Sequence, residues 1–167
     1  MFMKRLELTD DMLTGITEID NQHRELFAFG NAVLFPAEGK ATKNNIITAL
    51  LFLINYVDEH FSAEERLMKY YGYDRLNRHQ KQHQRLHAEV VELHRRAMNA
   101  NTFDGLLSEL QYLFGDWYVY HIKEWDQSYA LFLQSRADHD VTIIPGLKYV
   151  DDSEVKFLKP ENGHIGR

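Results

Sequence analysis

Hydrophobic residues recur at alternating steps of three and four over most of the chain, the spacing that places them on one face of an α-helix. Short breaks rich in proline, glycine or asparagine divide this pattern into four stretches. We therefore expect helices over about 16–35, 42–71, 75–99 and 102–134. The third stretch has the most regular apolar face, made of Leu76, His79, His83, Leu86, Val90, Leu93 and Ala97.

The expected helix ends carry residues that commonly begin or stop helices. Thr42 and Thr102 are candidate N-caps, Pro36 ends the first stretch, and Gly72 ends the second. Short connections force successive helices to run antiparallel. The fold class predicted is therefore all-α, an antiparallel up-down-up-down four-helix bundle with an N-terminal arm.

The pattern changes after residue 134. Short β-prone runs at 141–144, 147–150 and 155–158 are separated by proline and glycine. This segment is too short for a second domain. We interpret residues 1–134 as one bundle domain and residues 135–167 as an irregular C-terminal tail or linker.

Composition narrows the class of protein. Of 167 residues, 44% are hydrophobic and 26% are charged, as in a globular domain, and the net charge is −6. An acidic chain without a basic run is not expected to bind nucleic acid or an anionic membrane surface. We see no apolar run long enough to span a bilayer and no signal peptide, so we expect a cytoplasmic protein without membrane insertion. The lack of cysteine excludes disulfides and thiolate metal sites.

Histidine is the residue type that suggests chemistry. Nine are present, and each expected helix places at least one on or beside its apolar face: His23, His60, His79, His83 and His121. The pairs His60/Glu64 and His79/His83 are each four residues apart, so each pair shares a helix face. A single buried histidine is usually a hydrogen-bonded core residue. Five converging with carboxylates would be costly to bury unless a metal coordinates them.

The donor types leave the metal open, because imidazole with carboxylate suits iron, zinc, manganese or copper. One ion cannot use seven ligands, whereas two ions can. If the imidazoles divide three and two, and two carboxylates and a small oxygen bridge serve both ions, one ion keeps an open position. Such a position on a redox-active pair suits dioxygen or another small ligand.

Four motifs, in this order and spacing, resemble the hemerythrin family, specifically its bacterial members, the bacteriohemerythrins. They are Ile19-Asp-Asn-Gln-His23, His60-Phe-Ser-Ala-Glu-Glu65, His79-Gln-Lys-Gln-His83 and His121-Ile-Lys-Glu-Trp-Asp126, and the resemblance spans about residues 8–134. It implies two iron ions per chain as cofactor. One would be held by His79, His83 and His121, and the other by His23 and His60. Glu64 and Asp126 would bridge them, and dioxygen would bind at the two-histidine iron.

Asp126 is assigned by this resemblance alone. Five residues beyond His121 is about 140° further around an ideal helix, so the two side chains should not share a face. Periodicity favours Glu124 or Trp125 instead. A local π-type widening of the helix, or a side chain that reaches around it, would reconcile Asp126 with the site.

The chain departs from the family pattern at two positions. Leu8 stands where the family often has tryptophan, and Tyr118 follows Trp117 where leucine is common. We expect Trp117 and Tyr118 to line the ligand pocket, where the phenol would replace an aliphatic side chain and alter autoxidation. The alternatives are a plain core role for Trp117 and an outward-facing ring for Tyr118. Glu65 is expected to be solvated.

The resemblance implies reversible dioxygen binding for carriage, storage or delivery. The alternative is a sensor of oxygen, redox state or nitric oxide that signals to a protein partner, or self-associates, through the tail. We do not expect an enzyme, because the expected helices lack the Glu-x-x-His motif of ferritin-like proteins and the His-Glu-x-x-His motif of zinc hydrolases. Peroxide or nitric oxide chemistry at the same site is a third possibility.

Overall fold

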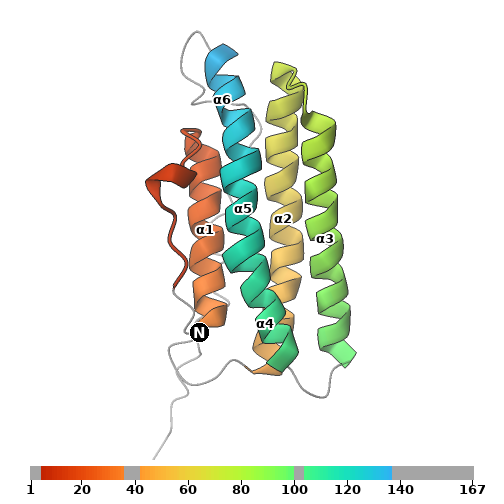
Figure 1. Ribbon diagram of the computed structural model, residues 1–167. Coiled ribbons are helices and arrows are strands. Elements are labelled where there is room, and N and C mark those ends of the chain that lie inside the picture. Colours follow the sequence, from red (N-terminus) through yellow and green to blue (C-terminus); the bar gives the residue numbers. More distant parts are fainter. Residues whose placement is uncertain (1–4, 36–41, 100–103, 137–167) are drawn as a thin grey trace, which may run out of the picture.

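The computed structural model describes residues 5–35, 42–99 and 104–136, and these form four antiparallel rods (Figure 1). The first three rods are α1 (Thr17–Leu34), α2 (Lys43–Tyr71) and α3 (Leu76–Asn99). The fourth is a continuous rod of five segments: α4 (Asp104–Tyr112), η2 (Leu113–Trp117), α5 (Tyr118–His121), η3 (Ile122–Asp126) and α6 (Gln127–Arg136). The predicted all-α bundle is confirmed, and none of the described residues forms a strand.

The ends of α2 follow the sequence prediction. The Thr42 hydroxyl accepts a hydrogen bond from the Asn45 backbone N–H, and the Asn45 side chain accepts one from the Thr42 N–H. Gly72 ends the helix with φ +69°, a left-handed conformation that glycine adopts without strain. The predicted cap Thr102, the 36–41 connection and the β-prone runs of the tail lie outside the described residues.

An N-terminal arm precedes α1 and lies along it (Figure 1). The Asn31 side chain bonds both backbone groups of Leu6, accepting from its N–H and donating to its carbonyl, each at 2.8 Å. Where the arm joins α1, the buried carboxylate of Asp20, a residue of that helix, accepts hydrogen bonds from the backbone N–H groups of Thr14 and Gly15. The arm of residues 5–13 contains one short 3-10 turn, η1 (Asp10–Met12).

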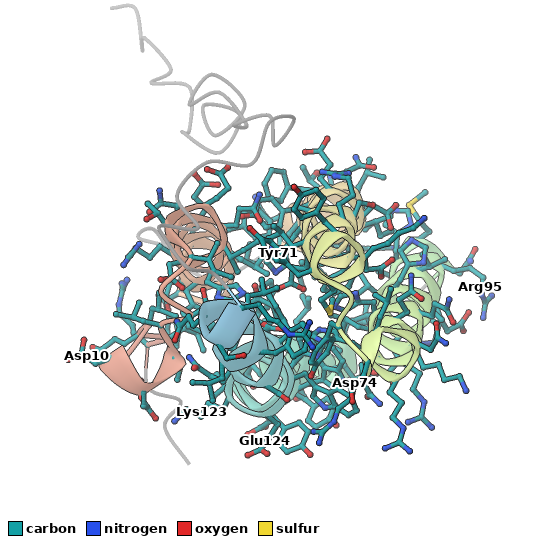
Figure 2. The ribbon with its side chains drawn as sticks, turned by 90° about the horizontal axis from the view of Figure 1, so that it is seen from above. Asp10, Tyr71, Asp74, Arg95, Lys123 and Glu124 are labelled. Atoms are coloured by element: carbon teal, nitrogen blue, oxygen red, sulfur yellow. The ribbon has the colours of Figure 1, made fainter. Side chains whose placement is uncertain are left out.

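Two apolar clusters fill the bundle, and a layer of polar side chains separates them. The larger is built around residues such as Leu26, Leu50, Leu93 and Phe114, and the smaller contains Ile16, Ile19, Leu67, Met68, Tyr129 and Leu133. On every rod the histidines named above stand where one cluster gives way to the other. Viewed along the bundle axis, charged residues such as Arg95 and Glu124 point outward (Figure 2).

One described helix, α2, is long and apolar enough to cross a membrane by length and composition. Half of the qualifying window is buried against the other rods, as in the core helix of a bundle.

At Gly30, α1 packs tightly against the fourth rod. A Cβ at this position would lie 2.8 Å from Cδ1 of Phe114 and 3.0 Å from Cδ1 of Leu6. Phe114 is buried, so its ring has little room to move aside. The absence of a side chain at Gly30 therefore allows the arm, α1 and η2 to meet.

We predict that Gly30→Ala destabilises the protein by about 1–3 kcal/mol, because overpacking outweighs the better helix propensity of alanine. Denaturant unfolding of the metal-free protein measures this. Gly105→Ala is the matched control, because nothing lies within 4 Å of the added methyl group. It should leave the free energy of unfolding equal or higher. Equal effects of the two substitutions would contradict this account of the packing.

Candidate metal centre

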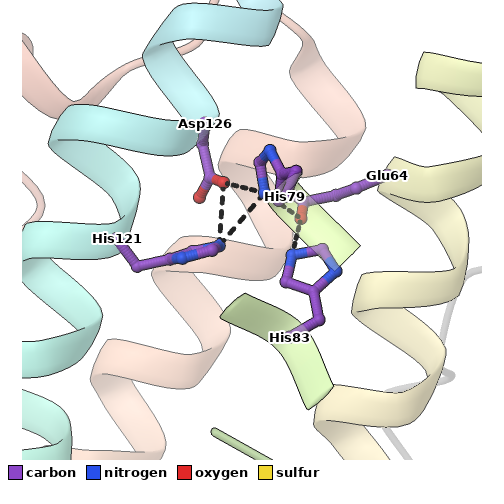
Figure 3. A group of neighbouring side chains, drawn as sticks. All are labelled: Glu64, His79, His83, His121 and Asp126. Atoms are coloured by element: carbon purple, nitrogen blue, oxygen red, sulfur yellow. Dashed lines mark hydrogen bonds and ion pairs between the residues drawn. The ribbon is translucent and has the colours of Figure 1, made fainter. Parts of the chain in front are cut away.

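Seven polar side chains from all four rods converge in the layer between the two apolar clusters. Their donor atoms form two groups, each with all donor atoms within 4.8 Å of one another. One group holds His79, His83 and His121, the other holds His23 and His60, and both include Glu64 and Asp126. Figure 3 shows the first group with its side chains directed toward one another. All seven sequence-predicted residues are therefore brought together.

Asp126 directs one oxygen at each group. Its Oδ1 lies 3.2 Å from Nε2 of His79 and 3.1 Å from Nε2 of His121. Its Oδ2 lies 3.3 Å from Nε2 of His23, on the other side. The carboxylate thus stands between the two sets of imidazoles.

Glu64 repeats this arrangement from α2. Its Oε2 lies 3.1 Å from Nε2 of His83, and its Oε1 lies 3.7 Å from Nε2 of His60. Every one of these histidine contacts uses Nε2. The two carboxylates are thus common to both groups, and two adjacent cations could share them, with three imidazoles beside one cation and two beside the other.

A π-helical segment explains how Asp126 reaches the site. In η3 (Ile122–Asp126) the backbone N–H of Gln127 donates to the carbonyl of Ile122, five residues earlier. This wider turn lets His121 and Asp126 face the same interior. Of the two ways in which Asp126 could reach the site, the π-type widening of the helix is confirmed. Periodicity favoured Glu124 or Trp125 in place of Asp126, and that prediction is wrong. Glu124 is exposed, and Trp125 lies toward the surface.

Electrostatics hold both carboxylates in the ionised form. Burial and their mutual repulsion raise the pKa of Glu64, but the surrounding histidines outweigh both effects and lower it to about 2. The pKa of Asp126 is likewise well below its usual value: burial opposes this, but contacts with His121, His23 and His79 prevail. Burial lowers the pKa of His60 to about 4, which leaves that imidazole neutral near pH 7.

The same cluster contains buried polar atoms that make no hydrogen bond to any described residue. They are Nδ1 and Nε2 of His23, Oε2 of Glu64, Nδ1 of His79, Nε2 of His83, Nδ1 of His121 and both carboxylate oxygens of Asp126. Unsatisfied groups of this kind are rare in folded proteins and costly. Cations among the Nε2 and carboxylate atoms would satisfy most of them. The residues therefore fit a metal pair, and nitrogen with oxygen donors suits iron, zinc, manganese or copper.

Three further side chains hold the cluster and were not identified as partners from the sequence. Nδ1 of His60 lies 2.8 Å from the Gln22 amide oxygen, and Nδ1 of His83 lies 2.8 Å from a Glu65 oxygen. The buried Tyr129 hydroxyl donates to Oε1 of Glu64 at 3.0 Å. The expectation that Glu65 is merely solvated is wrong. Such partners fix the orientation of a ligating imidazole.

The two expected pocket residues lie on different sides of the cluster. The Trp117 ring stacks on His121 at 4.8 Å between centroids, with an interplanar angle of 11°. The Tyr118 ring is buried, and its hydroxyl lies 3.5 Å from Nε2 of His60. The outward-facing alternative for Tyr118 is therefore wrong.

We predict that metal uptake at pH 7 releases about one proton from His83. Burial alone would lower the pKa of His83, but the neighbouring Glu64 and Glu65 carboxylates raise it to about 9. The metal-free side chain is therefore protonated at pH 7 and must lose that proton to coordinate. Calorimetric titration with Zn²⁺, a redox-inert probe, in buffers of different ionisation enthalpy counts the protons.

Glu65→Gln should release fewer protons, because it removes one of the two carboxylates that raise the pKa of His83. Glu124→Gln, at an exposed position, is the matched control and should behave as the wild type. Equal proton release by all three proteins would contradict the assignment to His83.

Comparison with known proteins agrees with this geometry. The family model described as the hemerythrin HHE cation binding domain matches residues 14–132. The bacteriohemerythrin of Pseudomonas paraeruginosa is 33% identical over 128 residues, which cover 77% of this chain and 81% of that protein. The bacteriohemerythrin of Clostridium acetobutylicum is 29% identical over 123 residues, covering 72% of this chain and 95% of that protein. The chain therefore belongs to the hemerythrin family.

Proposed function

We propose that the chain binds two iron ions at the paired sites and binds dioxygen reversibly for carriage, storage or delivery. The observation that supports this most directly is the pair of carboxylates, Glu64 and Asp126, each with one oxygen toward each group of imidazoles. Ions that share two carboxylates are held close enough to act as a unit. When bound, a ferrous pair would supply two electrons to dioxygen and would recover them when dioxygen is released.

The unequal division of histidines supports a dioxygen site at the group with fewer of them. The group of His23 and His60 has one imidazole fewer than the other group, which leaves room for an exogenous ligand. The surroundings on this side are apolar: the Tyr118 ring meets His23 at 5.8 Å and Phe27 at 5.6 Å, edge to face. A small, weakly polar molecule suits such apolar surroundings.

The chemistry of the pocket favours binding over turnover. Burial raises the pKa of Tyr118 well above its usual value, so near neutral pH its hydroxyl is a hydrogen-bond donor and not a base. We infer that it contacts the ligand without taking part in acid–base catalysis. The sensor alternative depends on the tail, residues 135–167, and residues 137–167 of it lie outside the described residues.

We predict two iron ions per chain after anaerobic reconstitution with Fe²⁺. The reduced protein should develop a visible absorption band in air and lose it on deoxygenation over repeated cycles. Asp126→Asn should lower the iron content, because it removes a shared anionic ligand, whereas Asp116→Asn, at an exposed position, should not. A wild-type protein that holds no iron, or that bleaches irreversibly in air, would contradict reversible binding.

We predict that Tyr118→Phe releases dioxygen about tenfold faster, because one hydrogen bond contributes about 1–1.5 kcal/mol. Stopped-flow mixing of the oxygenated protein with a dioxygen scavenger measures this rate, and autoxidation is followed in the same samples. Tyr120→Phe removes a hydroxyl from an exposed ring two residues away and is the matched control. If both variants release dioxygen and autoxidise at wild-type rates, the phenol has no role in the pocket.

A further inference from the structure

An open groove runs along α3 where it faces the fourth rod. This α3 groove is lined by Arg78, Lys81, Gln82, Arg85 and Trp125, among others, and has a volume of about 550 Å³. A second hollow of about 330 Å³ adjoins it and shares Gln82 and Trp125 with it. The two hollows therefore lie next to each other on this face of the bundle, and we refer to them together as the depression.

The charge of the α3 groove is opposite to that of the whole chain. Although the net charge is −6, three exposed cations, Arg78, Lys81 and Arg85, line the groove with no acidic side chain among its lining residues. None of the three forms an ion pair with another described residue. In the adjoining hollow, Asp116 is the one acidic lining residue. The groove therefore favours an anionic partner.

Two tryptophans connect this depression to the metal centre. Trp125 lines both hollows, and its ring lies 5.8 Å from that of His79. Trp117 lines the adjoining hollow and stacks on His121. Both histidines belong to the three-histidine group. Aromatic contacts thus lead directly from a partly exposed surface to that half of the centre.

We propose that the α3 groove is the docking site of an acidic electron-donor protein that reduces the oxidised centre. This inference rests on the proposed function, because it requires an iron pair that autoxidises. Two successive one-electron transfers convert the diferric pair to the diferrous pair, and the donor is oxidised by one electron each time. Electrons enter at the three-histidine side, whereas dioxygen binds at the two-histidine side.

The shape of the groove favours a protein over a small molecule. It is open to solvent, and its cations extend over about 10 Å of α3, from Arg78 to Arg85. Electron-transfer partners form small, transient interfaces in which charge steers the encounter more than it adds affinity. A row of unpaired cations beside two aromatic rings suits such an encounter.

The test is a stopped-flow reduction of the iron-loaded diferric protein by a reduced plant-type [2Fe–2S] ferredoxin, an acidic one-electron donor of low potential. Arg78→Gln, Lys81→Gln and Arg85→Gln are combined in one groove variant. Its matched control changes three exposed cations outside the groove by the same charge: Arg24→Gln, Arg66→Gln and Lys69→Gln. Dithionite, a small anionic reductant used at high ionic strength so that the charge of the groove does not affect its approach, tests whether each protein has an intact reducible centre.

At low ionic strength we expect the groove variant to accept electrons from ferredoxin at least tenfold more slowly than the wild type or the control. Salt should slow the wild type strongly and the groove variant little. Dithionite should reduce all three proteins alike. Iron content and dioxygen binding, measured on the same samples, should also be unchanged.

Equal ferredoxin rates for the groove variant and the control would overturn the proposal while leaving the proposed function intact. A groove variant that is also slow with dithionite would overturn it as well, because the substitutions would then act on the centre itself. If the wild type is a dimer and the groove substitutions make it monomeric, the groove binds a second copy of the chain, and the proposal is overturned. A wild-type protein without iron would overturn the proposed function, and this inference with it.

Discussion

Two ionised carboxylates lie buried among five imidazoles at the middle of the bundle, and the arrangement of the rest of the structure follows from that burial. Glu64 and Asp126 have almost no exposed surface, yet the surrounding histidines keep their pKa values low. Charge at this depth is tolerated only when it is paired or coordinated. Because the donors come from all four rods, the relative positions of the rods are tied to the geometry of one polar layer. The apolar clusters on either side separate that layer from water.

The fourth rod meets this constraint by changing its backbone. Each π turn inserts one extra residue and rotates everything that follows by about 100° relative to a regular helix. In η3 this rotation brings Asp126 onto the face of His121. The earlier π segment, η2, ends at Trp117, directly before Tyr118 and one turn before His121. Irregular backbone is thus concentrated where the rod contributes His121 and Asp126 to the cluster, whereas α1, α2 and α3 contribute their histidines and Glu64 from regular helices.

The helices and most of the cluster could be predicted from the sequence because both depend on local spacing. Periodicity places His23, His79, His83 and His121 on buried faces, and the structure agrees. Asp126 could not be placed in this way, because a spacing argument assumes a constant turn and the turn changes within η3. The hydrogen-bond partners Gln22, Glu65 and Tyr129 bond across to other rods, so no local pattern marks them. They follow from tertiary packing alone.

The two halves of the centre differ in ways that follow from their neighbours. On the two-histidine side, His60 is held by the neutral amide of Gln22 and covered by the buried ring of Tyr118. On the three-histidine side, the Glu65 carboxylate accepts from His83, which makes that imidazole a stronger donor to a cation. Trp125 and Trp117 connect the three-histidine group to the surface. On the two-histidine side, the Tyr118 ring packs against Phe27 in the interior. The two groups of donors thus differ in their surroundings: the two-histidine group lies beside the buried ring of Tyr118, whereas the three-histidine group has the anionic Glu65 and two tryptophans that reach the surface.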